Sequence, residues 1–293
     1  MELLIAVIGG DARYLELIRQ LEALPDVTIV LVGFDNLEQS FTGLKQSDFQ
    51  ELDPGDLDVV ILPITGTDES GNIETVFSNQ PIQLTNDWFH RLKNTAILFT
   101  GMANAYLTKQ VEAVDVELVA LLDRDDVAIY NSIPTAEGAI MMAIEHTDYT
   151  LHSSNVVVTG FGRVGHTIAN KFSGLGANVS VASRSLSDLA RVTEMNLTAI
   201  PLDRLSEYLD NCDFLINTIP APVITQEAIE KLPAHTVIID LASKPGGTDF
   251  AFAKKRGIKA ILARSLPGVV APKTAGKILA NVIIQILEER GLA

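Results

Sequence analysis

The sequence predicts two α/β domains with parallel sheets, one following the other along the chain. Its 293 residues are enough for two domains of about 150 residues each. Short apolar runs alternate with segments of helix length in both halves, which is typical of βαβ units and a parallel sheet. Hydrophobic residues make up 47% of the chain and its mean hydropathy is +0.24, which suits strands that are buried on both faces.

The first half contains five apolar runs that we interpret as strands, and glycine or proline closes several of them. The expected strands are 3–8, 28–32, 59–62, 96–99 and 116–122. A helical pattern over 13–24 follows the first strand, whereas the stretch 35–56 shows no clear pattern. We take 1–134 as the N-terminal α/β domain.

A linking helix is expected between the two domains. The segment Asn131-Ser-Ile-Pro134 breaks the alternation, and a helical run follows with Pro134 just ahead of its start, where proline is favoured. A new βαβ series then opens at Asn155. We therefore place the linking helix at 135–150.

The second half repeats the alternation more clearly and is taken as one domain over 151–293. The expected strands are 156–159, 178–182, 214–217, 237–240 and 260–262. The expected helices are 164–175, 187–194 and 275–290. The last helix carries an apolar stripe, and from this stripe and the mean hydropathy of +0.24 we predict a homodimer or a higher oligomer. The alternative is that this stripe packs against its own domain.

A glycine motif identifies what the second domain binds. Gly160-x-Gly162-x-x-Gly165 follows a strand and opens a helix, the context in which this motif binds a dinucleotide pyrophosphate. The helix N-terminus offers N–H groups and a positive dipole to the phosphates. The C-terminal domain is therefore predicted to be a Rossmann NAD(P)-binding fold. The expected cofactor-binding residues of this turn are Gly160, Phe161, Gly162, Arg163, Val164 and Gly165.

The end of the next strand favours NADP over NAD. An NAD site would place an acid there, but the strand ends in Ser183-Arg184-Ser185. A guanidinium pairs well with a 2′-phosphate, and the serines can add hydrogen bonds. The alternative is that Arg184 stacks on adenine, in which case either cofactor would bind. Thr218 and Pro220, after the following strand, are also expected to face the cofactor.

The overall charge and composition exclude several classes of function. With 22 Lys plus Arg against 37 Asp plus Glu, the formal charge is −15, which disfavours nucleic acid as a partner. The five histidines lack metal-ligand spacing, so no metal site is predicted. Cys212, the single cysteine, is expected to be buried. Neither a signal peptide nor a transmembrane segment is expected, and cytoplasmic localisation follows.

In a protein of this charge, cations beside turns are candidates for binding an anionic substrate. Arg13 follows the glycine pair of the first strand, although Asp11 can equally be a helix cap there. Lys244 is the lone cation after the strand 237–240. Lys273 and Thr274 stand at the start of the last helix, and Thr100 ends the strand 96–99.

Several strings of residues resemble one family over essentially the whole length, the dipicolinate synthase A subunits. In the first domain they are Ile8-Gly-Gly-Asp-Ala-Arg13, Val76-Phe-Ser-Asn79, Asn104-Ala-Tyr-Leu107, Arg124-Asp-Asp, Ile129-Tyr-Asn-Ser-Ile-Pro-Thr135 and His146-Thr-Asp-Tyr149. In the second they are Asp240-Leu-Ala-Ser, Pro245-Gly-Gly-Thr-Asp-Phe250 and Val270-Ala-Pro-Lys-Thr-Ala-Gly276. The chain departs from the family pattern chiefly at Ala263-Arg264-Ser265.

This resemblance implies an NADP-linked oxidation of dihydrodipicolinate to dipicolinate during endospore formation, with a flavoprotein-like dipicolinate synthase B subunit as partner. The dicarboxylate is expected between the domains, held by Arg13, Lys244 and Lys273. Neutral Lys244, Glu137 and water are the candidate bases. The alternatives are an NADP dehydrogenase of another small carboxylic acid, or a cofactor-binding protein without catalytic activity.

Overall fold

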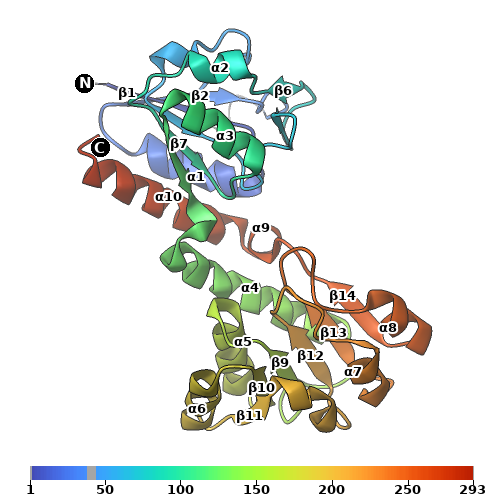
Figure 1. The fold of residues 1–293 in the computed structure, drawn as a ribbon. Coiled ribbons are helices and arrows are strands. Elements are labelled where there is room, and N and C mark those ends of the chain that lie inside the picture. The colour runs from blue at the N-terminus through green and yellow to red at the C-terminus, as the bar shows by residue number, and fades with distance from the viewer. Residues whose placement is uncertain (1, 38–43, 293) are drawn as a thin grey trace. The chain divides into compact units, whose positions relative to one another are not determined.

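The computed structural model describes residues 2–37 and 44–292. The chain folds into two compact units, and each is described here by itself (Figure 1). The first unit contains residues 1–128 together with 271–293, and the second contains 129–270. None of the helices within the described ranges is long and apolar enough to cross a membrane.

The first unit is built on a parallel sheet whose described strands have the order β3-β2-β1-β4-β7-β8. These strands are β1 (Leu3–Ile8), β2 (Val27–Val32), β3 (Lys45–Gln46), β4 (Val59–Ile61), β7 (Ile97–Thr100) and β8 (Glu117–Ala120). In the register, Ile5 of β1 pairs with Ile29 on one side and Val59 on the other. A small antiparallel pair, β5 (Asn72–Ile73) and β6 (Ile82–Gln83), lies outside this sheet.

Helices cover both faces of the first sheet. One apolar core contains side chains of α1 (Ala12–Glu22) and α10 (Pro272–Glu289), and Figure 1 shows these two helices side by side. The other core contains Trp88 and Phe89 of α2 (Asn86–His90) with Leu107 of α3 (Ala105–Val114). The strands are therefore buried on both faces, as their continuous apolar sequences predict.

The second unit has the same strand order, β11-β10-β9-β12-β13-β14, and all its pairs are parallel. The strands are β9 (Asn155–Thr159), β10 (Asn178–Ser183), β11 (Thr198–Pro201), β12 (Phe214–Asn217), β13 (Val237–Asp240) and β14 (Lys259–Leu262). The helices are α5 (Arg163–Gly174), α6 (Leu186–Glu194), α7 (Gln226–Lys231), α8 (Phe250–Arg256) and α9 (Leu266–Val270), with a 3-10 segment, η4 (Leu202–Tyr208). This is the Rossmann order that the sequence predicts.

Two cores lie on the two faces of this second sheet. The α5 side chains of Ile168 and Phe172 belong to one core, together with small residues of α4 (Asp125–Glu145). The η4, α7 and α8 side chains belong to the other. All ten predicted strands are present within a few residues of their expected bounds. The described strands β3, β5, β6 and β11 are additional, and part of the unpatterned stretch, 38–43, lies outside the described residues.

The last helix belongs to the first unit, which corrects its expected place in the second domain. Its apolar stripe packs against α1, and Leu279, Ile283 and Leu287 are essentially inaccessible to solvent. A Cβ built on Gly276 would lie 2.1 Å from the Arg13 carbonyl oxygen, so glycine allows the close contact. The prediction of a dimer loses one of its two supporting observations, because this stripe is covered within the chain, while the mean hydropathy of +0.24 stands.

The linking helix begins earlier than predicted. The helix α4 starts at Asp125 and includes Pro134, which the sequence analysis placed just ahead of a helix. Proline removes the N–H that would bond the Tyr130 carbonyl. Side chains bond the carbonyls on either side: the Ser132 hydroxyl donates to the Ile129 oxygen (2.6 Å) and Thr135 to the Asn131 oxygen (2.7 Å). The helix therefore continues through a sequence that is typical of a break.

Candidate cofactor site

The glycine motif forms the turn between β9 and α5. Gly160 has a φ of 92°, in the left-handed region that favours glycine, and its N–H donates to the Ala182 carbonyl at 2.8 Å. A Cβ built on Gly165 would lie 2.1 Å from the Gly160 carbonyl oxygen. Only glycine therefore lets α5 approach the end of β9 this closely.

Gly162 lies on the open side of the same turn, directly before α5. No side chain caps the helix there, and a Cβ built on Gly162 would have no described atom within 4 Å. The first N–H groups of a helix have no partner within the helix and carry the positive end of its dipole. The turn thus presents bare backbone donors to an anionic group such as a pyrophosphate. Phe161 beside it is half-buried, and the centroid of its ring lies 5.1 Å from the centroid of the His166 ring.

The turn after β10 contains the three residues predicted to bind the 2′-phosphate. Arg184 is exposed and has no hydrogen bond or ion pair with another described residue. Ser183 is buried, and its hydroxyl donates to Asp188 Oδ2 at 2.7 Å. Ser185 caps α6 by accepting from the Asp188 N–H at 3.3 Å. Arg184 is thus accessible, whereas the proton of Ser183 is already used within the turn.

A buried hydrogen-bond network joins the ends of β9, β12 and β13. The Thr159 hydroxyl donates to Asn217 Oδ1 (2.7 Å), and Asn217 Nδ2 donates to Asp240 Oδ1 (3.0 Å). All three side chains are fully buried. The Thr218 hydroxyl donates to the Thr159 carbonyl at 2.8 Å and so packs behind the glycine turn, while Pro220 is exposed. This network fixes the strand ends that border the predicted cofactor.

Asp240 also holds the loop that contains Lys244. Its carboxylate accepts from the N–H groups of Ala242 and Gly247, both at 3.0 Å, and from the Thr248 hydroxyl at 2.7 Å. These bonds tie down both ends of the loop. Lys244 stands between them, exposed and without a hydrogen bond or ion pair in the described ranges. Its ammonium group is therefore available to a ligand.

The other candidates in the two units differ in how accessible they are. Glu137 is exposed on α4 in the second unit. Lys273 and Thr274 are exposed in the first turn of α10, in the first unit. Thr100 is fully buried, and its hydroxyl donates to the Pro63 carbonyl at 3.0 Å. Thr100 is therefore no longer a candidate to contact the substrate, because its buried hydroxyl is already hydrogen-bonded within the fold.

Arg13 is already paired, unlike the free cation that the sequence suggested. Its Nη2 lies 2.5 Å from Asp11 Oδ2, and only 12% of its side chain is exposed. Asp11 also caps α1 by accepting from the Arg13 N–H at 3.0 Å. Burial acts to raise the pKa of the Asp11 carboxyl, but the hydrogen bond and the charge of Arg13 outweigh it and the pKa is lowered. Arg13 is therefore a weaker candidate for the substrate than Lys244.

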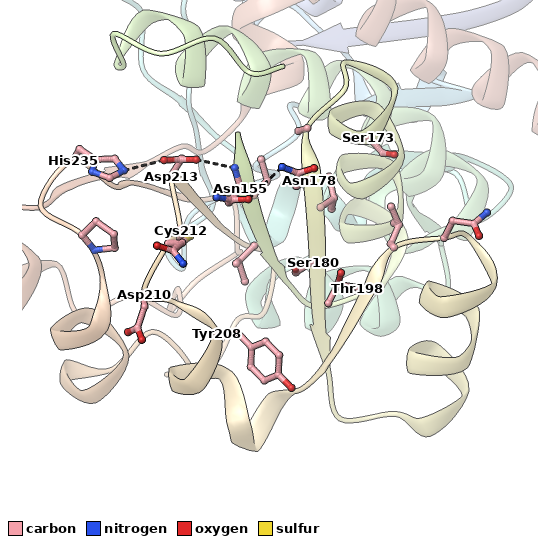
Figure 2. Close-up of a pocket in the computed structure, with 18 residues that line it drawn as sticks. Asn155, Ser173, Asn178, Ser180, Thr198, Tyr208, Asp210, Cys212, Asp213 and His235 are labelled. Carbon is pink, nitrogen blue, oxygen red and sulfur yellow. Dashed lines mark hydrogen bonds and ion pairs between the residues drawn. The ribbon is translucent and has the colours of Figure 1, made fainter. Parts of the chain in front are cut away.

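A pocket of the second unit lies away from the glycine turn, at the amino ends of its strands (Figure 2). Its volume is about 790 Å³. Figure 2 shows His235 bonded to Asp213, which in turn accepts from the Asn155 N–H. Cys212 lines it as a buried side chain, as predicted, and burial raises the pKa of its thiol. Ligands of open parallel sheets bind at the opposite, carboxyl edge, so this pocket is not the cofactor site.

Comparison with known proteins identifies the family. Residues 4–122 match the N-terminal domain of the dipicolinate synthase A subunit, and residues 132–243 match the NAD binding domain of D-isomer specific 2-hydroxyacid dehydrogenases. The chain is 50% identical to the dipicolinate synthase A subunit of Bacillus subtilis (strain 168) over 285 residues, which cover 97% of this chain and 96% of that protein. The chain belongs to the family of dipicolinate synthase A subunits.

Two further relatives are similar to the chain. The crystal structure of the dipicolinate synthase A subunit from Bacillus halodurans is 49% identical and superimposes with a TM-score of 0.94 over 98% of each chain. Shikimate dehydrogenase (NADP(+)) of Staphylococcus haemolyticus (strain JCSC1435) is 26% identical over 115 residues, which cover 38% of this chain and 42% of that protein. The family and the NAD-binding domain together make the chain an oxidoreductase with a nicotinamide cofactor.

A nicotinamide dinucleotide fits the carboxyl edge of the second sheet in this member of the dipicolinate synthase family. The space beside Gly162 is open, and the two flanking glycines allow the tight turn. Sequence reasoning found this turn but missed the network of Thr159, Asn217 and Asp240, because its parts are far apart in the chain. It also missed Asp188, although Ser185-x-x-Asp188 has the spacing of a helix capping motif.

Proposed function

We propose that this chain oxidises dihydrodipicolinate to dipicolinate with NADP, the step that the resemblance assigns to endospore formation. The observation that carries the proposal is the 50% identity to the dipicolinate synthase A subunit over 97% of the chain. The site supports it, because the glycine turn is intact and an exposed cation stands at each of two strand ends, after β10 and after β13.

The choice of NADP rests on Arg184. Its guanidinium is exposed and unpaired within the described residues, at the strand end where a Rossmann fold places the adenosine ribose. A guanidinium offers a 2′-phosphate two parallel charge-assisted hydrogen bonds. The similar shikimate dehydrogenase is named for NADP(+), which agrees with this choice.

The reaction removes a hydride and a proton from the dihydropyridine ring and leaves an aromatic dicarboxylate. The bound nicotinamide supplies the hydride acceptor. We assign Lys244 to pair with a substrate carboxylate, because its loop is held at both ends by Asp240 and its ammonium is unpaired in the described ranges. Lys273 and Thr274 are further candidates to bind a carboxylate, from the first unit. Arg13 is the weakest of these candidates, because a substrate carboxylate would have to compete with Asp11 for the Arg13 guanidinium.

The proton that leaves the ring needs an acceptor. Glu137 and water are the candidates if Lys244 stays charged and binds the carboxylate; a neutral Lys244 is the alternative. Aromatisation supplies much of the driving force, so the main task of these side chains is to position the ring against the nicotinamide. A Lys244→Met variant should therefore raise the Michaelis constant for dihydrodipicolinate and leave the dissociation constant for NADP within about twofold.

The dipicolinate synthase B subunit is the proposed partner, because the relative's name describes one of the subunits of a synthase. A homodimer is not part of the proposal, since the α10 stripe is buried within the chain. The test follows nicotinamide absorbance after freshly made dihydrodipicolinate is added to the chain and NADP, with and without the B subunit. Reduction of NADP with stoichiometric dipicolinate supports the proposal. No reduction in either mixture contradicts it and favours a cofactor-binding protein without catalytic activity.

A further inference from the structure

The turn between β10 and α6 brings an acid back to the end of the strand. Asp188 is five residues beyond Ser183 in sequence, yet its Oδ2 accepts the Ser183 hydroxyl proton at 2.7 Å. Ser183 is the last residue of β10, and only 6% of it is exposed. Asp188 itself is half-buried. The strand end therefore carries a carboxylate, although the residues that directly follow the strand include none.

Other polar groups of this turn are also hydrogen-bonded to one another. The Ser185 N–H donates to Ser183 Oγ at 3.2 Å, so this hydroxyl accepts one bond and donates another. Ser185 Oγ accepts from the Asp188 N–H and shares a hydrogen bond with Ser187 Oγ at 2.7 Å. Two side-chain groups of this turn remain for a ribose substituent: the Arg184 guanidinium, which is unpaired among the described residues, and the remaining acceptor capacity of the Asp188 carboxylate.

These two groups favour opposite cofactors. A guanidinium attracts a 2′-phosphate, whereas a carboxylate repels that phosphate and accepts a hydrogen bond from a 2′-hydroxyl. We propose that Asp188 is a specificity-determining residue, which weakens the preference for NADP that Arg184 creates and allows NAD to bind at the same site. This inference rests on the proposed NADP site. It predicts a moderate selectivity that one substitution can sharpen.

The competing explanation is that Asp188 only stabilises the start of α6. Its N–H is capped by Ser185, and an acid in the first turn of a helix interacts favourably with the helix dipole. A purely structural role would change the affinity for both cofactors by the same factor, since they share every other contact. It would also respond weakly to salt. The ratio of the two affinities and its salt dependence therefore separate the two explanations.

The experiment measures the dissociation constants of NADP and NAD by titration calorimetry in the full chain, at about 20 mM and about 500 mM salt. In Asp188→Asn, the carboxylate that repels the 2′-phosphate is gone. The dissociation constant of NADP divided by that of NAD should therefore fall about three- to tenfold at low salt, with a smaller change at high salt. Ser183→Ala removes the hydrogen bond between Ser183 and Asp188 but keeps the Asp188 charge. The ratio of the two dissociation constants in this variant should therefore stay within about twofold of the wild-type ratio. Asp210→Asn removes one exposed negative charge near the amino edge of the same sheet and should leave the ratio unchanged.

An unchanged ratio in Asp188→Asn, or an equal shift in Asp210→Asn, would overturn the inference. If Asp188→Asn does not fold, Asp188→Ser takes its place, because serine is also neutral and is smaller than aspartate. The wild-type ratio tests the NADP proposal separately. Tighter binding of NAD by the wild type contradicts that proposal, whereas the shift in the variant still decides the role of Asp188.

Discussion

At the scale of single residues, the proposed preference for NADP rests on Arg184. Replacing it with alanine should weaken NADP binding by about 1–3 kcal/mol, because a charge-assisted contact to the 2′-phosphate is lost. NAD binding should be nearly unchanged, since NAD has no phosphate there. Titration calorimetry with both cofactors checks this. Equal losses for the two would show that Arg184 stacks on the adenine instead.

Substitutions of two glycines in the turn after β9 should separate effects on the stability of the fold from effects on cofactor binding. Gly165→Ala places a Cβ against the Gly160 carbonyl oxygen and should destabilise the fold by about 1–3 kcal/mol, the usual cost of overpacking. Gly162→Ala meets only open space and should cost at most about 1 kcal/mol, the loss of glycine before a helix. Cofactor affinity should nevertheless fall by roughly tenfold or more in Gly162→Ala, because backbone approach to the pyrophosphate is blocked. Wild-type affinity in that variant would mean that the pyrophosphate does not approach this turn.

The Asp11–Arg13 pair predicts a pH effect on stability. The lowered pKa of Asp11 means that its ionised form stabilises the fold above the unfolded pKa, and that this contribution disappears as pH falls through the lower folded value. Asn also caps helices, so Asp11→Asn should lose only the ion pair, up to about 1 kcal/mol. Urea unfolding should show this difference at about pH 7 and a smaller one at about pH 3. An equal difference at both values would contradict the assignment.

At the scale of elements, strands were predictable because apolar runs in parallel sheets are bounded by glycine and proline. Four described strands were missed. The strands β3, β5 and β6 are two residues long, and β11 (Thr198–Pro201) has only a short apolar run. The start of α4 was misplaced because proline is favoured in the first turn of a helix, whereas Pro134 lies inside α4. The place of α10 depends on a contact with α1, at the opposite end of the sequence, which local patterns do not contain.

The packing of α10 against α1 can be tested at one glycine. Gly276→Ala would put a Cβ 2.1 Å from the Arg13 carbonyl oxygen and should lower the free energy of unfolding by about 1–3 kcal/mol. Gly174→Ala, at the end of α5, is the matched control, because its Cβ would have no neighbour within 4 Å. It should be neutral or stabilise by up to about 1 kcal/mol. Equal effects of the two changes would mean that α10 does not pack as described.

At the scale of the whole molecule, the proposed site is a small set of positive groups in a chain of formal charge −15. Sequence alone located the glycine turn, Arg184 and Lys244, because each lies next to a strand end. It could not show that Arg13 is paired, that Thr100 is buried or that Asp188 returns to Ser183. Those facts depend on side-chain contacts. Binding of the anionic cofactor to these few cations should weaken as salt is raised.

The most direct measurement of the central claim is an experimental structure of the chain with NADP bound. We predict the pyrophosphate against the backbone N–H groups at Gly162 and the start of α5, and the 2′-phosphate within hydrogen-bond distance of the Arg184 guanidinium. The nicotinamide should lie beside the loop that contains Lys244. NADP bound elsewhere, such as in the pocket at the amino ends of the strands, would contradict the account.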